Sequence, residues 1–242
     1  MGIISFLYGA VGYLAFLVSF TYAIGFVGNV LVPKGIDTPP HGSIPEALLV
    51  DLLLLGLFAV QHSVMARKGF KQWWTRIVPE PIERSTFVLA SSVALGLLLW
   101  QWQPIDGWLW TVQAPAARLA LQGLFWLGWV IALSSTFMIN HFDLFGLRQV
   151  YLRLKGEPYR PLPFVKVALY RFVRHPLMLG LLIAFWATPD MSYGHLLFAL
   201  ATTGYIFIGI WLEERDLRRM HGEAYERYCR EASMIVPLPG RR

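Results

Sequence analysis

Four short polar segments stand out from an otherwise apolar chain, because each carries side chains that can move a proton or bind an ion. Each segment lies at the boundary of an apolar block, where ionisable groups are either solvated or part of a functional site. If they converge on one membrane face, together they make a better site than any one of them alone. The segments are residues 61–62, 140–143, 170–176 and 213–216.

The third segment combines a guanidinium, an imidazole and a proline at Arg174, His175 and Pro176. Proline suits the first helical position, where its missing N–H costs nothing, so we expect a helix to begin at Pro176. The free N–H groups of such a helix start can hold a carboxylate. Gly180, one turn later, would let a ligand or another helix approach closely. The plainer alternative is that Arg174 and His175 are ordinary basic residues at a cytoplasmic boundary.

The fourth segment begins at Glu213 and Glu214 and is followed by Tyr225 and Tyr228. On one continuous helix, positions 214, 217, 221, 225 and 228 would share a face that carries a carboxylate, a histidine and two tyrosines. Such a face could accept hydrogen bonds from a ribose and give aromatic walls to an adenine. The alternative is an amphipathic helix whose arginines face phospholipid, and both can hold on opposite sides of the helix.

Two further segments carry histidines. His141 and Asp143 follow the fourth apolar block, where either could act as a base; the alternative is helix capping with solvation, because Asn and Asp favour helix ends. His62 ends the second block, and imidazole suits proton transfer near neutral pH, although a structural histidine is the more common case. Cys229 is the single cysteine, so we expect neither an intrachain disulfide nor a cysteine-rich metal site. We predict no metal-ligating residues.

The composition indicates a membrane protein. The 242 residues are 56% hydrophobic and 15% charged, with a mean hydropathy of +0.50, whereas soluble domains carry about 25% charged residues. Five apolar blocks are long enough to cross a bilayer, and a sixth, 177–188, is short and forms a hairpin with the last block. We therefore predict an all-α polytopic membrane protein with five to six transmembrane helices, a C-terminal helical hairpin and a cytoplasmic tail helix. The blocks are 3–32, 44–65, 85–102, 117–139, 177–188 and 195–212.

We expect one membrane domain over residues 1–242, because no long linker interrupts the chain. Residues 1–140 would supply the N-terminal spans, and residues 141–242 would form the cofactor-binding core. Neither a GxGxxG motif nor a P-loop is present, so a Rossmann nucleotide site has no support.

The basic residues predict the orientation of the chain. Of the 21 Lys and Arg residues, five lie in 67–84, seven in 141–174 and seven in 213–242, which leaves Lys34 and Arg118 for the two opposite loops. Because positive charge stays on the cytoplasmic side, we expect the three basic segments and the site to face the cytoplasm. Clustering against membrane lipids also explains the pI of 9.6 without a nucleic-acid partner. The expected location is a bacterial inner membrane, with no obligate protein partner evident.

The order of these motifs resembles the C-terminal core of isoprenylcysteine carboxyl methyltransferases and phospholipid methyltransferases. The chain departs from their pattern at Met178, where those enzymes often have Tyr, which removes a hydroxyl there and leaves any backbone role intact. Upstream, residues 61–67 and 83–86 resemble the NnrU-like branch. Residues 140–149 resemble methanethiol S-methyltransferases, membrane enzymes that make dimethyl sulfide. The C-terminal resemblance rests on Arg174, His175, Pro176, Gly180, Glu213, Glu214, Leu217, Gly222, Tyr225 and Tyr228.

The resemblance implies S-adenosylmethionine as methyl donor and a small volatile thiol, methanethiol, as acceptor. On the thiol side, His141 or Asp143 would accept the proton, Arg174 or Arg171 would favour the thiolate, and His62 is a further catalytic candidate. Three alternatives stay open: another acceptor, such as an isoprenylated thiol or a lipid; a haem-binding or transport protein that uses His62 and His141; and a sterol-reductase-like enzyme of similar membrane architecture. The implied cofactor-binding residues are Tyr170, Arg174, His175, Leu177, Gly180, Glu213, Glu214, Tyr225 and Tyr228.

Overall fold

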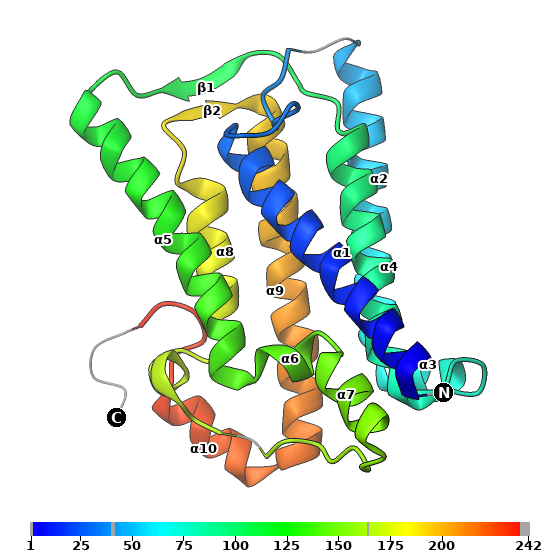
Figure 1. The fold of residues 1–242 in the computed structure, drawn as a ribbon. Coiled ribbons are helices and arrows are strands. Elements are labelled where there is room, and N and C mark those ends of the chain that lie inside the picture. The colour runs from blue at the N-terminus through cyan, green and yellow to red at the C-terminus, as the bar shows by residue number, and fades with distance from the viewer. Residues whose placement is uncertain (1, 40–41, 164, 238–242) are drawn as a thin grey trace. The chain divides into compact units, whose positions relative to one another are not determined.

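The structure, a computed structural model, describes residues 2–39, 42–163 and 165–237 and is predominantly α-helical (Figure 1). Five of its helices are long and apolar enough to cross a membrane, and one further apolar helix is short. The predicted all-α polytopic fold is therefore confirmed, and the protein is an integral membrane protein. Arg241 and Arg242, which belong to the basic tail, lie outside the described residues. The long helices are α1 (Gly2–Gly28), α2 (Ile44–Ala66), α4 (Glu80–Gln101), α5 (Pro115–Ile139) and α9 (Tyr193–His221), and the short one is α8 (Pro176–Trp186).

Shorter elements occupy the segments between the spans. Two of them, β1 and β2, pair as antiparallel strands with Trp110 opposite Met191. This pairing was not predicted, because β2 lies where the sequence indicated only a turn and its partner is far away in the chain. The shorter elements are α3 (Lys68–Trp74), β1 (Trp108–Thr111), α6 (His141–Leu144), α7 (Leu147–Lys155), the 3-10 helix η1 (Ala168–Arg171), β2 (Asp190–Ser192) and α10 (Glu223–Glu231).

The chain forms two compact units, and the sequence alternates between them. Unit 1 comprises Met1–Gly107 and Asn140–Pro163, and unit 2 comprises Trp108–Ile139 and Phe164–Arg242. The segment after residue 140, which we grouped with the cofactor-binding core, thus packs within unit 1. The single-domain organisation stays a prediction.

Unit 1 is a bundle of α1, α2 and α4 with α7 packed on α1 and α4. Small residues let α1 approach α4 closely: a Cβ atom on Gly12 would lie 3.0 Å from the Ser85 carbonyl oxygen. The basic segments of this unit lie at one end, because the Arg84 Nε donates a 2.8 Å hydrogen bond to the Leu144 carbonyl. Lys34 lies at the other end of α4, where its Nζ donates to the Trp100 carbonyl at 2.6 Å. This separation of charge agrees with the predicted orientation of unit 1.

Unit 2 is built around the crossing of α5 and α8. A Cβ atom on Gly180 would lie 2.5 Å from both the Ala132 nitrogen and the Gly128 carbonyl oxygen. The close approach that we predicted at Gly180 is therefore made by a helix, and small residues permit it. The other end of α5 is fixed by Arg118, which forms a bidentate ion pair with Asp190 at 2.9 and 2.7 Å.

Two predicted helix boundaries were wrong. Helix α1 ends at Gly28 instead of continuing to residue 32, because Asn29 and Leu31 adopt left-handed backbone conformations with φ of 52° and 58°. Helix α4 begins at Glu80, five residues before the apolar block at residue 85. Pro79 precedes this helix and a second proline lies in its first turn, where proline is favoured.

The predicted tail helix exists as α10, but it is not continuous with α9. Gly222, with φ of 50° and ψ of −126°, separates the two helices. This conformation suits glycine, which lacks a Cβ atom. The expected single helical face from position 214 to position 228 is therefore wrong. Tyr225 and Tyr228 instead form a buried cluster with Ala232, against which Leu217 packs.

Candidate functional site

A buried carboxylate organises the polar end of unit 2. Glu214 lies near the end of α9, and its side chain is only 8% exposed. Its Oε1 accepts a 2.7 Å hydrogen bond from the Arg174 Nε, and the same oxygen lies 3.2 Å from the His175 Nε2. Its Oε2 pairs with the Arg218 Nη2 at 3.1 Å. We call Arg174, His175, Glu214 and Arg218 the Glu214 cluster; it joins two sequence motifs that are about 40 residues apart.

Arg174 also connects the Glu214 cluster to the end of α10. Its Nη1 donates to the carbonyl oxygens of Cys229 and Ala232 at 3.2 and 2.7 Å, which satisfies acceptors that a helix end leaves open. The backbone strengthens this link, because the Arg174 N–H donates to the Ser233 carbonyl at 2.8 Å and Val173 forms a parallel bridge with Ser233. The charge of Arg174 is therefore paired with Glu214, and its Nη1 is engaged by two backbone carbonyls. Its role in binding a thiolate stays a prediction.

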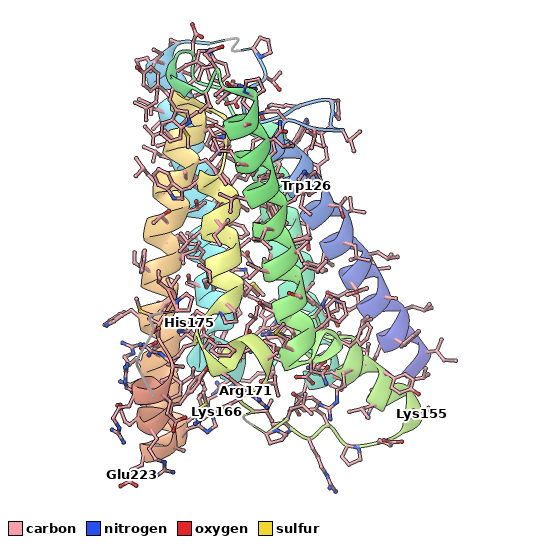
Figure 2. All side chains as sticks on the ribbon, turned by 90° about the vertical axis from the view of Figure 1, so that its left-hand side faces the viewer. Trp126, Lys155, Lys166, Arg171, His175 and Glu223 are labelled. Carbon is pink, nitrogen blue, oxygen red and sulfur yellow. The ribbon has the colours of Figure 1, made fainter. Side chains whose placement is uncertain are left out.

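The accessible groups of this region lie at the start of α8. His175 is the residue before Pro176 and is 5% exposed; Figure 2 labels it together with Arg171 and Lys166 of the preceding segment. The first-turn N–H groups of Leu177 and Met178 have no acceptor within the helix. Glu213 lies beside the ring of His175, the residue that precedes this helix: its side chain is 51% exposed, with Oε2 3.6 Å from the His175 Nδ1. An accessible carboxylate next to a helix N-terminus can bind a cationic or hydroxyl group and a carboxylate at the same time.

Tyr225 and Tyr228 are buried together, and Tyr228 contacts the backbone of the third predicted tyrosine, Tyr170. Tyr228 donates a 2.6 Å hydrogen bond to the Tyr170 carbonyl, and its ring packs edge-on against Tyr225 with the ring centroids 5.9 Å apart. Burial raises the pKa of all three phenols above the usual range, so they stay protonated. Tyr225 and Tyr228 are 1% and 3% exposed. Their rings hold α10 in place, and a role as an adenine wall stays a prediction.

Unit 1 contains a second, more exposed carboxylate. The side chain of Asp143 is 20% exposed and forms an ion pair with Arg148 at 2.9 Å. It also accepts hydrogen bonds from Gln149 at 3.5 Å and from the Tyr159 hydroxyl at 3.3 Å. The Arg148 guanidinium lies 5.2 Å from the centre of the Tyr159 ring. We call Asp143, Arg148, Gln149 and Tyr159 the Asp143 cluster. The ion pair and these hydrogen bonds hold the Asp143 carboxylate in a fixed position.

His141 belongs to the same segment but is enclosed. It is 2% exposed, its Nε2 lies 2.8 Å from the Tyr13 hydroxyl, and the rings of Phe16 and Phe145 contact it. Desolvation lowers the pKa of His141, which favours the neutral imidazole. Neither a thiol nor a haem iron has direct access to this ring in the described structure, so a positioning role fits the geometry better than direct proton transfer.

The side chain of His62, on α2, packs against α4. The same part of α4 carries Arg84, which was not among the predicted site residues. The His62 Nδ1 is 3.1 Å from the Ser91 hydroxyl, and its ring lies near Phe58 and Phe87, with centroid distances of 5.4 and 5.0 Å. Arg84 lies over the same Phe87 ring, with its guanidinium carbon 5.1 Å from the centroid. In the sequence Arg84 comes directly before the apolar block at residue 85, and only the start of α4 at Glu80 places it in the second turn of a span, where a charge often has a function.

Within unit 2 the structure thus brings together four predicted polar residues, Arg174, His175, Glu213 and Glu214. Tyr225 and Tyr228 form the buried cluster of α10, and Tyr228 donates to the Tyr170 carbonyl. The structure also adds Arg218, which was not among the predicted site residues. Leu177 lies in the first turn of α8, and Gly180 contacts α5. His62, His141 and Asp143 belong to unit 1.

Comparison with known proteins identifies related chains. The model of the NnrU protein family matches residues 50–213. A methanethiol S-methyltransferase of Mycobacterium tuberculosis is 58% identical over 98% of this chain and 98% of its own length. A second, from Crocosphaera subtropica, is 52% identical over 98% of this chain and 92% of its own. Nurim of Mus musculus is 33% identical over 75% of this chain and 72% of its own. No solved structure matches the chain.

Proposed function

We propose that this chain, which belongs to the NnrU protein family, transfers a methyl group to the sulfur of methanethiol and so forms dimethyl sulfide. The observation that carries the proposal is near-full-length identity of 58% and 52% to two proteins that bear the name of this activity. The buried Glu214 cluster agrees with it, because the cluster brings together the two motifs that resemble those of methyltransferases.

We propose S-adenosylmethionine as the methyl donor, which supplies a methyl group on a positively charged sulfur. The residues at the start of α8 fit its polar groups. The first-turn N–H groups of Leu177 and Met178 suit its carboxylate. Glu213, which is about half exposed, suits its ammonium group or its ribose hydroxyls. His175 and Glu214 hold these elements together and keep the α8 start fixed against α9.

The acceptor reacts as a thiolate, because a neutral thiol is a much weaker nucleophile. His141 and Asp143 remain the predicted thiol-side residues. Since His141 is enclosed and Asp143 is ion-paired, we propose that they shape the segment 140–163 and leave proton transfer to other groups. An apolar volatile substrate partitions into lipid, which suits an enzyme embedded in a membrane. We propose the bacterial inner membrane, with the basic segments 67–84, 141–174 and 213–242 facing the cytoplasm.

The test supplies membranes from expressing cells with S-adenosylmethionine and one acceptor at a time: methanethiol, an isoprenylated cysteine peptide or phosphatidylethanolamine. Gas chromatography measures dimethyl sulfide, and release of S-adenosylhomocysteine measures turnover with any acceptor. Turnover with methanethiol and with neither alternative supports the proposal. Turnover only with the peptide or the lipid would retain a methyltransferase and exclude the proposed substrate. A Soret band in the purified protein would instead favour the haem-binding alternative.

A further inference from the structure

Arg84 is a cation with unused hydrogen-bond donors. It is half-buried in the second turn of α4, and its Nε donates to the Leu144 carbonyl at 2.8 Å. A guanidinium has five N–H groups, and within residues 2–39, 42–163 and 165–237 no other acceptor is hydrogen-bonded to it. No carboxylate of those residues lies within 4.0 Å of it. A charged group of this kind at the edge of a membrane span indicates a ligand.

Two other partly buried arginines, Arg174 and Arg148, differ from Arg84 because each is paired with a carboxylate. Arg174 pairs with Glu214 at 2.7 Å and donates to two backbone carbonyls. Arg148 pairs with Asp143 at 2.9 Å and donates to the Arg160 carbonyl. The proposed reaction needs a cation that favours a thiolate. Of these arginines, only Arg84 has a positive charge that is not paired with a carboxylate.

The surroundings of Arg84 suit a small anion that carries a methyl group. The Phe87 ring, 6% exposed, contacts the Arg84 guanidinium on one helix and the His62 ring on the neighbouring helix. His62 in turn lies against the Phe58 ring. Aromatic carbon limits hydration at this point, and a charge interaction is stronger where water is scarce. An apolar wall next to a cation therefore fits methanethiolate better than it fits a large polar anion.

We propose that Arg84 binds the sulfur of the acceptor thiol and stabilises it as the thiolate. This inference rests on the proposed function. The S–H bond of the acceptor breaks and its proton passes to water. A lone pair of the resulting thiolate forms the bond to the methyl carbon of the donor. The bond from that carbon to the positively charged donor sulfur breaks, and its electron pair stays on the donor sulfur, which becomes a neutral thioether.

Several titratable groups surround Arg84 and can contribute to the pH dependence of kcat. All variants at position 84 keep these neighbours, so a difference between the pH profiles of the variants is due to residue 84. The groups are His62 of α2, Lys71 of α3, Glu83 of α4, Asp143 of α6 and Tyr159 of the segment after α7.

The experiment measures kcat at saturating methanethiol from pH 6 to pH 10 for wild type, Arg84→Gln, Arg84→Met and Arg84→Lys. The pH dependence of kcat reports groups in the enzyme–substrate complex. Without the cation the bound thiol ionises less readily, so in both neutral variants we expect the rising limb to move to higher pH by about one unit or more. We expect kcat at pH 7 to fall roughly 100-fold. Lysine keeps the positive charge, so kcat of Arg84→Lys should rise at the same pH as in wild type.

Arg76→Gln is the matched control, because it removes one positive charge from an exposed position of the same basic segment. Its pH profile should match that of wild type. The role of Arg84 would be overturned if kcat of a neutral variant rose at the same pH as in wild type. It would also be overturned if kcat of Arg84→Lys rose at the same high pH as in Arg84→Gln. Wild type that forms no dimethyl sulfide would instead overturn the proposed function. If neither neutral variant folds, the lysine profile still decides, and a limb raised by a full unit would contradict the inference.

Discussion

The Glu214 cluster of unit 2 and the Asp143 cluster of unit 1 both centre on a carboxylate paired with arginine, yet they are built differently. The Glu214 side chain is 8% exposed, and two of its partners, Arg174 and His175, come from about 40 residues away. The Asp143 side chain is 20% exposed, and its partners lie within 16 residues along the chain. The first cluster therefore depends on tertiary structure, whereas the second depends on a local segment.

This difference implies different consequences of mutation. Removing one member of a buried ion pair leaves the other charge without compensation, which is costly. A partly exposed pair is screened by water, and its removal costs little. We therefore expect the Glu214 cluster to control both the stability of unit 2 and the binding of the donor, and the Asp143 cluster to have modest effects on either.

The largest expected effect is that of Glu214→Ala. This change leaves Arg174, whose side chain is 9% exposed, without its carboxylate. We expect a loss of about 3–5 kcal/mol in the free energy of unfolding and no measurable binding of S-adenosylmethionine. Thermal unfolding in detergent and equilibrium dialysis with labelled donor measure these effects. Wild-type stability in this variant would show that the cluster is not essential to the fold.

Glu213→Gln separates donor binding from folding in the same region. The Glu213 side chain is 51% exposed, so its neutralisation should change the free energy of unfolding by no more than about 0.5 kcal/mol. If it binds the ammonium or ribose of the donor, its affinity for S-adenosylmethionine should fall about tenfold, which corresponds to about 1.4 kcal/mol. Unchanged affinity would remove Glu213 from the proposed donor site. Glu223→Gln, on the exposed start of α10, is the matched control.

Asp143→Asn tests the local cluster. The Arg148 partner is 25% exposed, and we expect a loss of about 1 kcal/mol or less in the free energy of unfolding. Turnover with methanethiol should fall less than tenfold, because the segment 140–163 keeps its fold. A loss of turnover above 100-fold with an unchanged unfolding temperature would restore Asp143 as a direct participant in the reaction.

The smallest expected effect is a pH dependence of stability from His141. Desolvation lowers the pKa of this imidazole in the folded protein, so below the unfolded value of about 6.5 the unfolded chain binds the proton more readily. The contribution of His141 to stability is complete above pH 6.5 and declines as the pH falls below that value. His141→Gln should flatten the stability profile between pH 6.5 and pH 5, measured by thermal unfolding. The same slope in both proteins would assign it to another group.

Hydropathy predicted most of the spans because the average over a long apolar block depends on many residues and little on any single one. Helices α2 and α5 match their apolar blocks within two residues at each end. The method gave wrong ends where single residues decide. Helix α4 begins directly after Pro79, five residues before its apolar block. Helix α1 ends directly before Asn29, within the first apolar block. It also gave no sign of β1 and β2, because strands of four and three residues carry little pattern.

The candidate site was predictable as a set of residues but not as a set of interactions. The order of motifs placed Arg174, His175 and Glu214 in one site. Their mutual pairing depends on the packing of α8 on α9, which pattern alone does not specify. The break at Gly222 and the bridge from Val173 to Ser233 have the same origin in tertiary structure. Arg84 was missed because one arginine at the start of a span looks like any other basic boundary residue.

The central claim is that this protein moves the methyl group of S-adenosylmethionine to methanethiol. The most direct measurement supplies membranes with donor carrying a trideuterated methyl group and with unlabelled methanethiol, and then analyses the headspace by gas chromatography and mass spectrometry. The account predicts dimethyl sulfide with one labelled and one unlabelled methyl group, and none from membranes with the Glu214→Ala variant. Unlabelled dimethyl sulfide, or no dimethyl sulfide from a wild-type protein that binds the donor, would contradict it.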